Sequence, residues 1–186
     1  NARNQQTDDD NMNKAVVGRL GVNPYQDIYF GLSGYYGSLN KSGTETLKML
    51  GLDALWDWGN WQFSAEYALV SMNVLDSKKT IIPSQMYGYY IEARYTMRSG
   101  LIDYIFSQFE TPTITYFARL GAVDTDVKNS TVQGDLTSNT QLTRFVYGFA
   151  IRPISTVAYK LEYHVNEEHT NKIDNNQFLG SIAVSF

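Results

Sequence analysis

The chain has 186 residues, a formal net charge of -4, 43% hydrophobic and 14% aromatic residues, and no cysteine. The aromatic content argues against disorder, the acidic balance offers no basic field for nucleic acid, and the lack of cysteine removes disulfide frameworks and thiolate metal sites. No run approaches the roughly 20 apolar residues that a transmembrane helix requires. A mildly polar chain rich in tyrosine is typical of a membrane β-barrel, whose lumen-facing residues dilute the lipid-facing ones.

Apolar residues alternate with small or polar residues in segments of roughly ten residues, which is the pattern of half-buried strands. Glycine, proline and asparagine separate these segments. We therefore predict nine strands, at 15–23, 27–39, 46–58, 61–74, 86–97, 113–124, 141–153, 156–166 and 177–186.

The predicted strands keep their charges on one face, and their other face is almost purely apolar and aromatic. At 86–97, for example, Tyr89 and Ile91 share one face, while Glu92 and Arg94 share the other. A soluble β-sandwich also alternates, but its outward face would carry more lysine and glutamate. In a membrane barrel the apolar face meets lipid and the polar face lines the lumen. The pattern therefore predicts an all-β, antiparallel, up-and-down transmembrane barrel.

Short and long connectors alternate along the chain. Tight turns are predicted at 24–26, 59–60 and 153–155, and longer polar loops at 40–45, 75–85, 125–140 and 167–176. Long loops on one rim and short turns on the other is the outer-membrane arrangement, so we expect the last three loops to be extracellular. The connector 98–112 is long although it falls on the short-turn rim. It carries apolar residues of its own, so we expect it to fold against the barrel.

The strand count bears on the domain organisation. Nine is odd, whereas single-chain bacterial barrels have an even number of strands, and lipid cannot satisfy the open edge of the first strand. We therefore expect residues 1–186 to be the C-terminal part of one larger barrel domain, with a polar loop at 1–14 and strands and loops at 15–186. The last predicted strand ends on the aromatic Phe186, as outer-membrane barrels do.

Five stretches carry a family resemblance. They are NMNKAVVGRLGVNPYQDIYFGLSGYYG at 11–37, GLDALWDWGNWQFSAEYAL at 51–69, GYYIEARY at 88–95, KLEY at 160–163 and the ending NQFLGSIAVSF. Together they resemble successive hairpins of the phosphate-selective porin O and P family, over nearly the whole chain. The resemblance implies a trimeric channel of about 16 strands in a Gram-negative outer membrane, a size that leaves an aqueous lumen.

The charged residues of the predicted strands are the candidate pore-lining residues. They are Arg19, Asp53, Asp57, Glu66, Glu92, Arg94, Arg119, Arg144, Arg152, Lys160 and Glu162. Phosphate selectivity requires a ladder of cationic side chains, but here the two signs nearly balance. We therefore carry over the fold and the porin role and not the selectivity. We expect Glu92 with Arg94, and Lys160 with Glu162, to pair across strands and stabilise the wall, because interior polar groups need partners.

Three tryptophans mark a predicted membrane interface. Trp56, Trp58 and Trp61 flank the Gly59-Asn60 turn and share the apolar face. Indoles at that position would lie at headgroup level on the periplasmic side, as an aromatic belt.

The sequence offers little for metal binding or catalysis. Asp8, Asp9 and Asp10 could supply oxygen ligands to calcium, and so could Asp124 with Asp126, but no EF-hand spacing follows, and solvated acidic loops explain them better. The two histidines, His164 and His169, could belong to a hydrolase pair, and His164 shares a face with Glu162. No G-x-S-x-G nucleophile motif is present, however, so we do not expect an enzyme. N-glycosylation sequons occur at Asn40 and Asn129, and the polar composition of the predicted loops explains them.

The function that follows is an outer-membrane porin for the passive diffusion of small hydrophilic solutes, anions included, without a cofactor. Its expected partners are the lipid bilayer and further copies in a homotrimer, or a larger outer-membrane complex. The alternative is a barrel with a plugged lumen that acts as a structural scaffold. A plug needs a long inserted segment, and only 98–112 and 125–140 come close to that length.

Overall fold

The computed structural model describes residues 14–40, 42–75, 83–108, 112–127, 141–168 and 174–185. Nine strands and one short helix lie in these ranges. The strands are β1 (Val16–Tyr25), β2 (Ile28–Ser38), β3 (Thr46–Trp58), β4 (Trp61–Asn73), β5 (Gln85–Met97), β6 (Thr113–Asp124), β7 (Gln141–Ile154), β8 (Val157–Glu168) and β9 (Gln177–Val184), and the helix is α1 (Gly100–Ile105). The nine-strand prediction is confirmed, and the bounds of β3 and β6 are those predicted.

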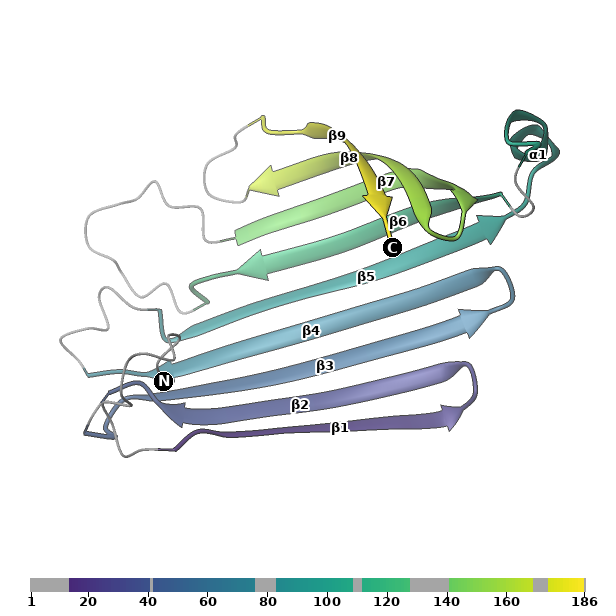
Figure 1. The fold of residues 1–186 in the computed structure, drawn as a ribbon. Coiled ribbons are helices and arrows are strands. Elements are labelled where there is room, and N and C mark those ends of the chain that lie inside the picture. Colours follow the sequence, from purple (N-terminus) through teal and green to yellow (C-terminus); the bar gives the residue numbers. More distant parts are fainter. Residues whose placement is uncertain are drawn as a thin grey trace.

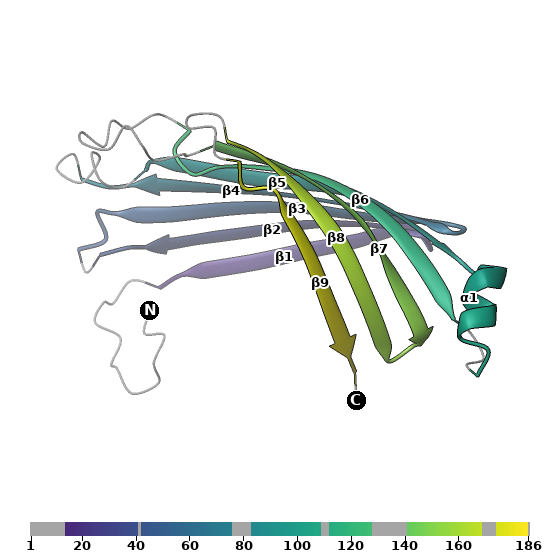
Figure 2. The same cartoon turned by 90° about the horizontal axis from the view of Figure 1, so that it is seen from above.

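The strands form one antiparallel sheet in which each strand pairs with its neighbours in sequence, from β1 to β9 (Figure 1). Within the described ranges, β1 pairs only with β2, and β9 pairs only with β8, so the sheet is open. The sheet is also bent across its strands, and β1 and β9 lie on the same side of the central strands β4 and β5 (Figure 2). The arrangement is an up-and-down meander with two free edges.

Tight turns join the strands at the end of the sheet that we name the turn end, and the opposite end is the loop end. Gly59 has a φ of 59°, in the left-handed region that glycine adopts without strain, and it turns β3 into β4 as predicted. The other two turns lie later than predicted, at 26–27 and 155–156. Pro24 and Pro153 lie inside β1 and β7 at register shifts, because proline lacks the N–H that regular pairing would need.

The connector between β5 and β6 contains α1, at the turn end of the sheet (Figure 1). Of its apolar residues, Ile102 is buried, whereas Leu101 and Ile105 are exposed. Arg98 Nη2 lies 3.6 Å from Asp103 Oδ1 at the first turn of α1. No helix in the described ranges combines the length and hydrophobicity needed to cross a membrane.

The pairing register carries the predicted two-faced pattern from β1 to β9, except near the loop end. One face, named the apolar face, includes Leu52, Phe63, Ile91, Phe149 and Ile182, and the other, named the charged face, includes Arg19, Glu66, Arg94, Arg119, Arg144 and Glu162. Glu92, Thr115, Val146 and Ala150 are buried on the charged face, whereas the buried residues Ile114 and Asp124, on the apolar face, lie at the two ends of β6. Side chains converge on the concave side of a bent sheet, so this crowding identifies the charged face as the concave one.

Candidate functional site

Glu92 is the centre of the most enclosed cluster on the charged face. Its side chain is 2% exposed and forms ion pairs with Arg94 on the same strand and with Arg119 on β6, where Nη2 lies 2.7 Å from Oε2. Arg119 Nε also donates a hydrogen bond to Glu92 Oε2 at 2.8 Å. The guanidinium of Arg119 lies over the ring of Tyr90, with Cζ 4.9 Å from the ring centroid. The expected Glu92–Arg94 pair thus forms along one strand, and the cross-strand partner is Arg119.

A second cluster runs along β8. Lys160 and His164 both contact the carboxylate of Glu162, and His164 Nε2 lies 3.0 Å from Oε1. The Lys160 ammonium lies 4.8 Å from the ring centroid of Phe117, which is on β6. The predicted Lys160–Glu162 pair therefore forms, but within β8 and not across strands. In this arrangement His164 serves as a structural partner of Glu162.

The third cluster on the charged face contains an ion pair between strands that are not neighbours. Arg19 Nη2 on β1 lies 2.8 Å from Asp53 Oδ2 on β3, and the same nitrogen donates to the Tyr29 hydroxyl at 2.8 Å. The intervening strand β2 places Gly31 beside Asp53 in the register. Because glycine has no side chain, the two charged groups meet above it.

The remaining charged residues of the predicted set have neutral partners. Arg144 donates to Asn166 at 2.6 Å, Arg152 donates to Thr115 at 3.3 Å, and Gln62 donates to Asp57 at 2.9 Å. Glu66 accepts a hydrogen bond from Tyr90, its cross-strand neighbour. All eleven predicted residues therefore lie on one face of the sheet, each with a described partner.

The two signs of charge are unevenly distributed over this face. Cations dominate over β5 to β8, where Arg94, Arg119, Arg144, Arg152 and Lys160 lie, and carboxylates dominate over β3 and β4, with Asp53, Asp57 and Glu66. A hollow of about 610 Å³ lies towards the turn end. Three cations, Arg94, Arg152 and Lys160, and two carboxylates, Asp57 and Glu92, are among its lining residues. The cationic side of the face thus borders open space into which a small solute fits.

Chemistry beyond ionic contacts has little support in the described part of the chain. There, no group of three or more histidine, aspartate or glutamate side chains is placed to hold a metal. Both carboxylate oxygens of Asp124 accept hydrogen bonds, from the Asp126 amide and from Gln141, which is a structural role. The candidates Asp8, Asp9, Asp10, His169 and Asn129 lie outside the described residues. So do most of the predicted loops at 75–85 and 125–140 and half of the one at 167–176.

Comparisons with protein-family models, with curated proteins and with solved structures found no match. The functional argument for this chain therefore rests on its own residues and geometry.

The tryptophans lie together on the apolar face at the turn end. Trp56 stacks on Trp58, with ring centroids 5.8 Å apart. The ring centroid of Trp61 lies 5.8 Å from that of Phe63 and 4.8 Å from that of Tyr95. All three indoles are exposed. The aromatic cluster thus spans β3, β4 and β5 at one level of the sheet.

Two features of the site escaped the sequence analysis. Phe117 lies on the charged face beneath Lys160, although the alternation of β6 places it with Thr115 and Arg119 and could have revealed it. The separation of charges is also incomplete. The register puts Lys48, Asp124 and Glu167 on the apolar face, all near the loop end, where the apolar face stops. The expectation that every strand keeps its charges on one face is wrong at this end.

Proposed function

We propose that this chain forms part of the wall of an outer-membrane β-barrel, of the porin kind that its sequence resembles. The observation that carries the proposal is the inverted exposure of neighbouring residues: Ile91 is 59% exposed, whereas Glu92, the next residue on β5, is 2% exposed. Exposing a large apolar side chain and burying a carboxylate is unfavourable in water. The same arrangement is favourable where lipid covers the apolar face.

The height of the apolar face fits a bilayer. On β4 the apolar face runs without a polar residue from Trp61 to Leu69, which is roughly 27 Å along a strand at about 3.4 Å per residue. A strand tilt of roughly 40° reduces this to about 21 Å, near the ~25 Å apolar band of membrane barrels. Trp58 and Trp61 lie at one limit of this band and the Tyr67–Tyr87 stack lies towards the other, as aromatic girdles do.

Closure of the barrel requires more strands than the nine described. The free edges of β1 and β9 present unpaired backbone groups, and lipid offers no partner for them. Further strands, from the same chain or from another copy, would pair with both edges. The family that the sequence resembles implies a barrel of about 16 strands, whose lumen is wide enough to hold water.

The solutes of this channel are small and hydrophilic, because the concave face carries ion pairs and polar side chains. The cationic stretch over β5 to β8 borders the hollow near Arg152, so anions would be favoured along that side of the lumen. Most cations contact a carboxylate or a neutral acceptor, which argues for weak and not strict anion preference.

Planar-bilayer conductance of the full-length protein tests this function. We expect stepwise, long-lived conductance increments with modest anion preference. A protein that inserts stably but does not conduct would support the alternative, a plugged barrel that scaffolds a larger outer-membrane assembly. A protein that stays soluble and monomeric without detergent would contradict both.

A further inference from the structure

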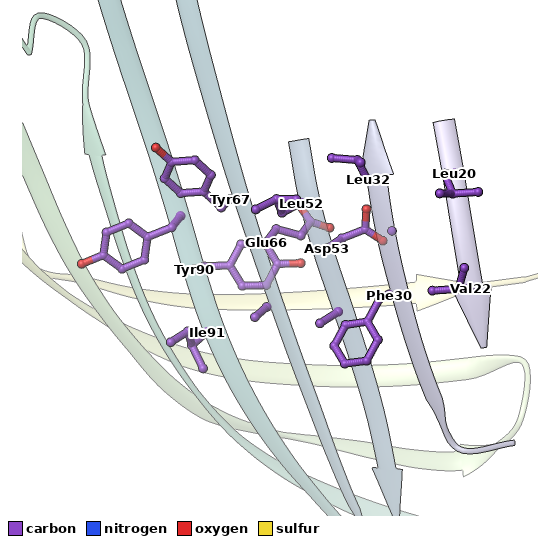
Figure 3. A pocket seen from close by; sticks show the side chains of 14 residues that line it. Leu20, Val22, Phe30, Leu32, Leu52, Asp53, Glu66, Tyr67, Tyr90 and Ile91 are labelled. Atoms are coloured by element: carbon purple, nitrogen blue, oxygen red, sulfur yellow. The ribbon is translucent and has the colours of Figure 1, made fainter. Parts of the chain in front are cut away.

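A groove crosses the apolar face over β1 to β5. Its volume is about 500 Å³, and Figure 3 shows Phe30, Leu32, Leu52 and Ile91 among the side chains around it. Its floor is formed by Ala54 and Ala65, which are cross-strand partners between larger residues. A smaller hollow of about 250 Å³ shares this floor and continues it towards Trp56 at the turn end.

The apolar face carries a cation above this groove. Lys48 lies on the same face of β3 as Leu52 and Leu50, and it is the next residue of that face after Leu50 towards the loop end. Its side chain is exposed, and its ammonium lies 5.7 Å from the ring centroid of Tyr36, its partner on β2. Its partner on β4 is Ser71, so neither cross-strand neighbour is acidic. Between Lys48 and the groove, Gly34 leaves open space, because a Cβ there would meet only one backbone oxygen, at 4.0 Å.

We propose that this surface binds one membrane lipid with an anionic phosphate headgroup. Its acyl chain lies in the groove over Ala54 and Ala65, and its phosphate meets Lys48. The apolar lining selects a hydrocarbon chain, and the cation at the level where the apolar band ends selects a negative headgroup. The site rests on the proposed function, because it requires the apolar face to lie in a bilayer.

Native mass spectrometry of the full-length protein in a non-ionic detergent measures this binding. The probes are dioleoyl phosphatidic acid and dioleoyl phosphatidylcholine, which carry the same chains and differ in headgroup charge. We expect phosphatidic acid to bind with a dissociation constant about fivefold lower, which corresponds to roughly 1 kcal/mol for one lysine near the headgroups. Equal affinity for the two lipids would overturn the proposal, and this comparison needs no variant.

Substitutions locate the site. Lys48→Gln should abolish the preference for phosphatidic acid, and Lys48→Arg should retain it. The pair Ala54→Leu and Ala65→Leu fills the groove and should weaken the binding of both lipids. The matched control is Ala93→Leu with Ala118→Leu, another cross-strand alanine pair on the same face, outside the groove.

Failure of the lipid site can be distinguished from failure of the pore. If the protein conducts in bilayers but binds both lipids equally, only the lipid site is excluded. If the control pair weakens binding as much as the groove pair does, binding is a general property of the apolar face and the site is again excluded. If the protein neither inserts nor conducts, the proposed function fails together with the site.

Discussion

Arg19 on β1 reaches Asp53 on β3 across the intervening strand, with 2.8 Å between Nη2 and Oδ2. The contact depends on Gly31, because a Cβ at that position would lie 2.5 Å from both carboxylate oxygens of Asp53. On the charged face, therefore, a missing side chain on one strand lets groups on its two neighbours meet. The positions of glycine as well as of charge thus determine which ion pairs form on this sheet.

Replacing Gly31 by alanine should displace Asp53 from Arg19, and the loss of this partly exposed ion pair costs a small amount of stability. In an ordinary strand the same change stabilises by roughly 0.5–1 kcal/mol, because glycine loses more backbone freedom on folding. Gly18 is the control, since a Cβ there would meet nothing within 4 Å. We expect Gly31→Ala to stabilise the protein less than Gly18→Ala does, measured by the urea dependence of folding in lipid vesicles. The two changes should become alike in an Asp53→Ala background, and failure to converge would contradict this account.

Gly148 on β7 should tolerate a side chain less well than Gly31 does. Its Cβ would overlap the Leu161 carbonyl oxygen and lie 2.8 Å from Glu162 Cα, and these are backbone atoms of β8 that cannot rotate away. Overpacking of this kind costs roughly 1–3 kcal/mol, which we expect for Gly148→Ala in the same unfolding experiment. Gly88→Ala is the matched change, because its nearest atom is at an ordinary 3.5 Å. Equal stability of the two variants would show that, at Gly148, β7 and β8 lie further apart than these distances indicate.

Removing the charge of Glu92 should make the proposed channel more selective for anions. Glu92→Gln leaves Arg94 and Arg119 without their shared carboxylate. Both arginines are partly exposed, so we expect a stability loss of about 1 kcal/mol, well below the 3–5 kcal/mol of a fully buried pair. The reversal potential in a KCl gradient should shift towards the chloride equilibrium potential. Glu167→Gln removes the same charge from the apolar face and should shift it less.

The strands, their two faces and the pairs Glu92–Arg94 and Lys160–Glu162 followed from the sequence, whereas the contacts between strands did not. Period-two alternation bounded by turn residues located β3 and β6 to the residue. It placed the ends of β1 and β7 too early, because Pro24 and Pro153 look like turn residues and are accommodated at register shifts. Alternation assigns each side chain to a face but does not fix which residues stand opposite. The Arg119–Glu92 pair and the Arg19–Asp53 contact depend on that register.

The stability cost of a charge introduced at Ile91 distinguishes a sheet that faces lipid from a sheet that faces water. Ile91 is 59% exposed and lies mid-strand between Ala65 and Leu120. In a water-soluble protein, Ile91→Arg at such an exposed position would change stability by only about 0.5 kcal/mol. Near the middle of a bilayer, arginine on the lipid-facing side of a barrel costs roughly 2–4 kcal/mol. We expect the larger value for folding into vesicles.

The matched variant is Ser64→Arg, which places the same side chain on the charged face. Ser64 stands opposite Glu92 on the charged face, where a water-filled lumen would solvate the new guanidinium, so this change should cost less than Ile91→Arg. Guanidinium titrations of both variants in vesicles, with Ile91→Leu as the conservative change, measure the difference. If Ile91→Arg and Ser64→Arg fold equally well, the apolar face does not meet lipid, because only hydrocarbon makes one face of this sheet so much less tolerant of charge than the other.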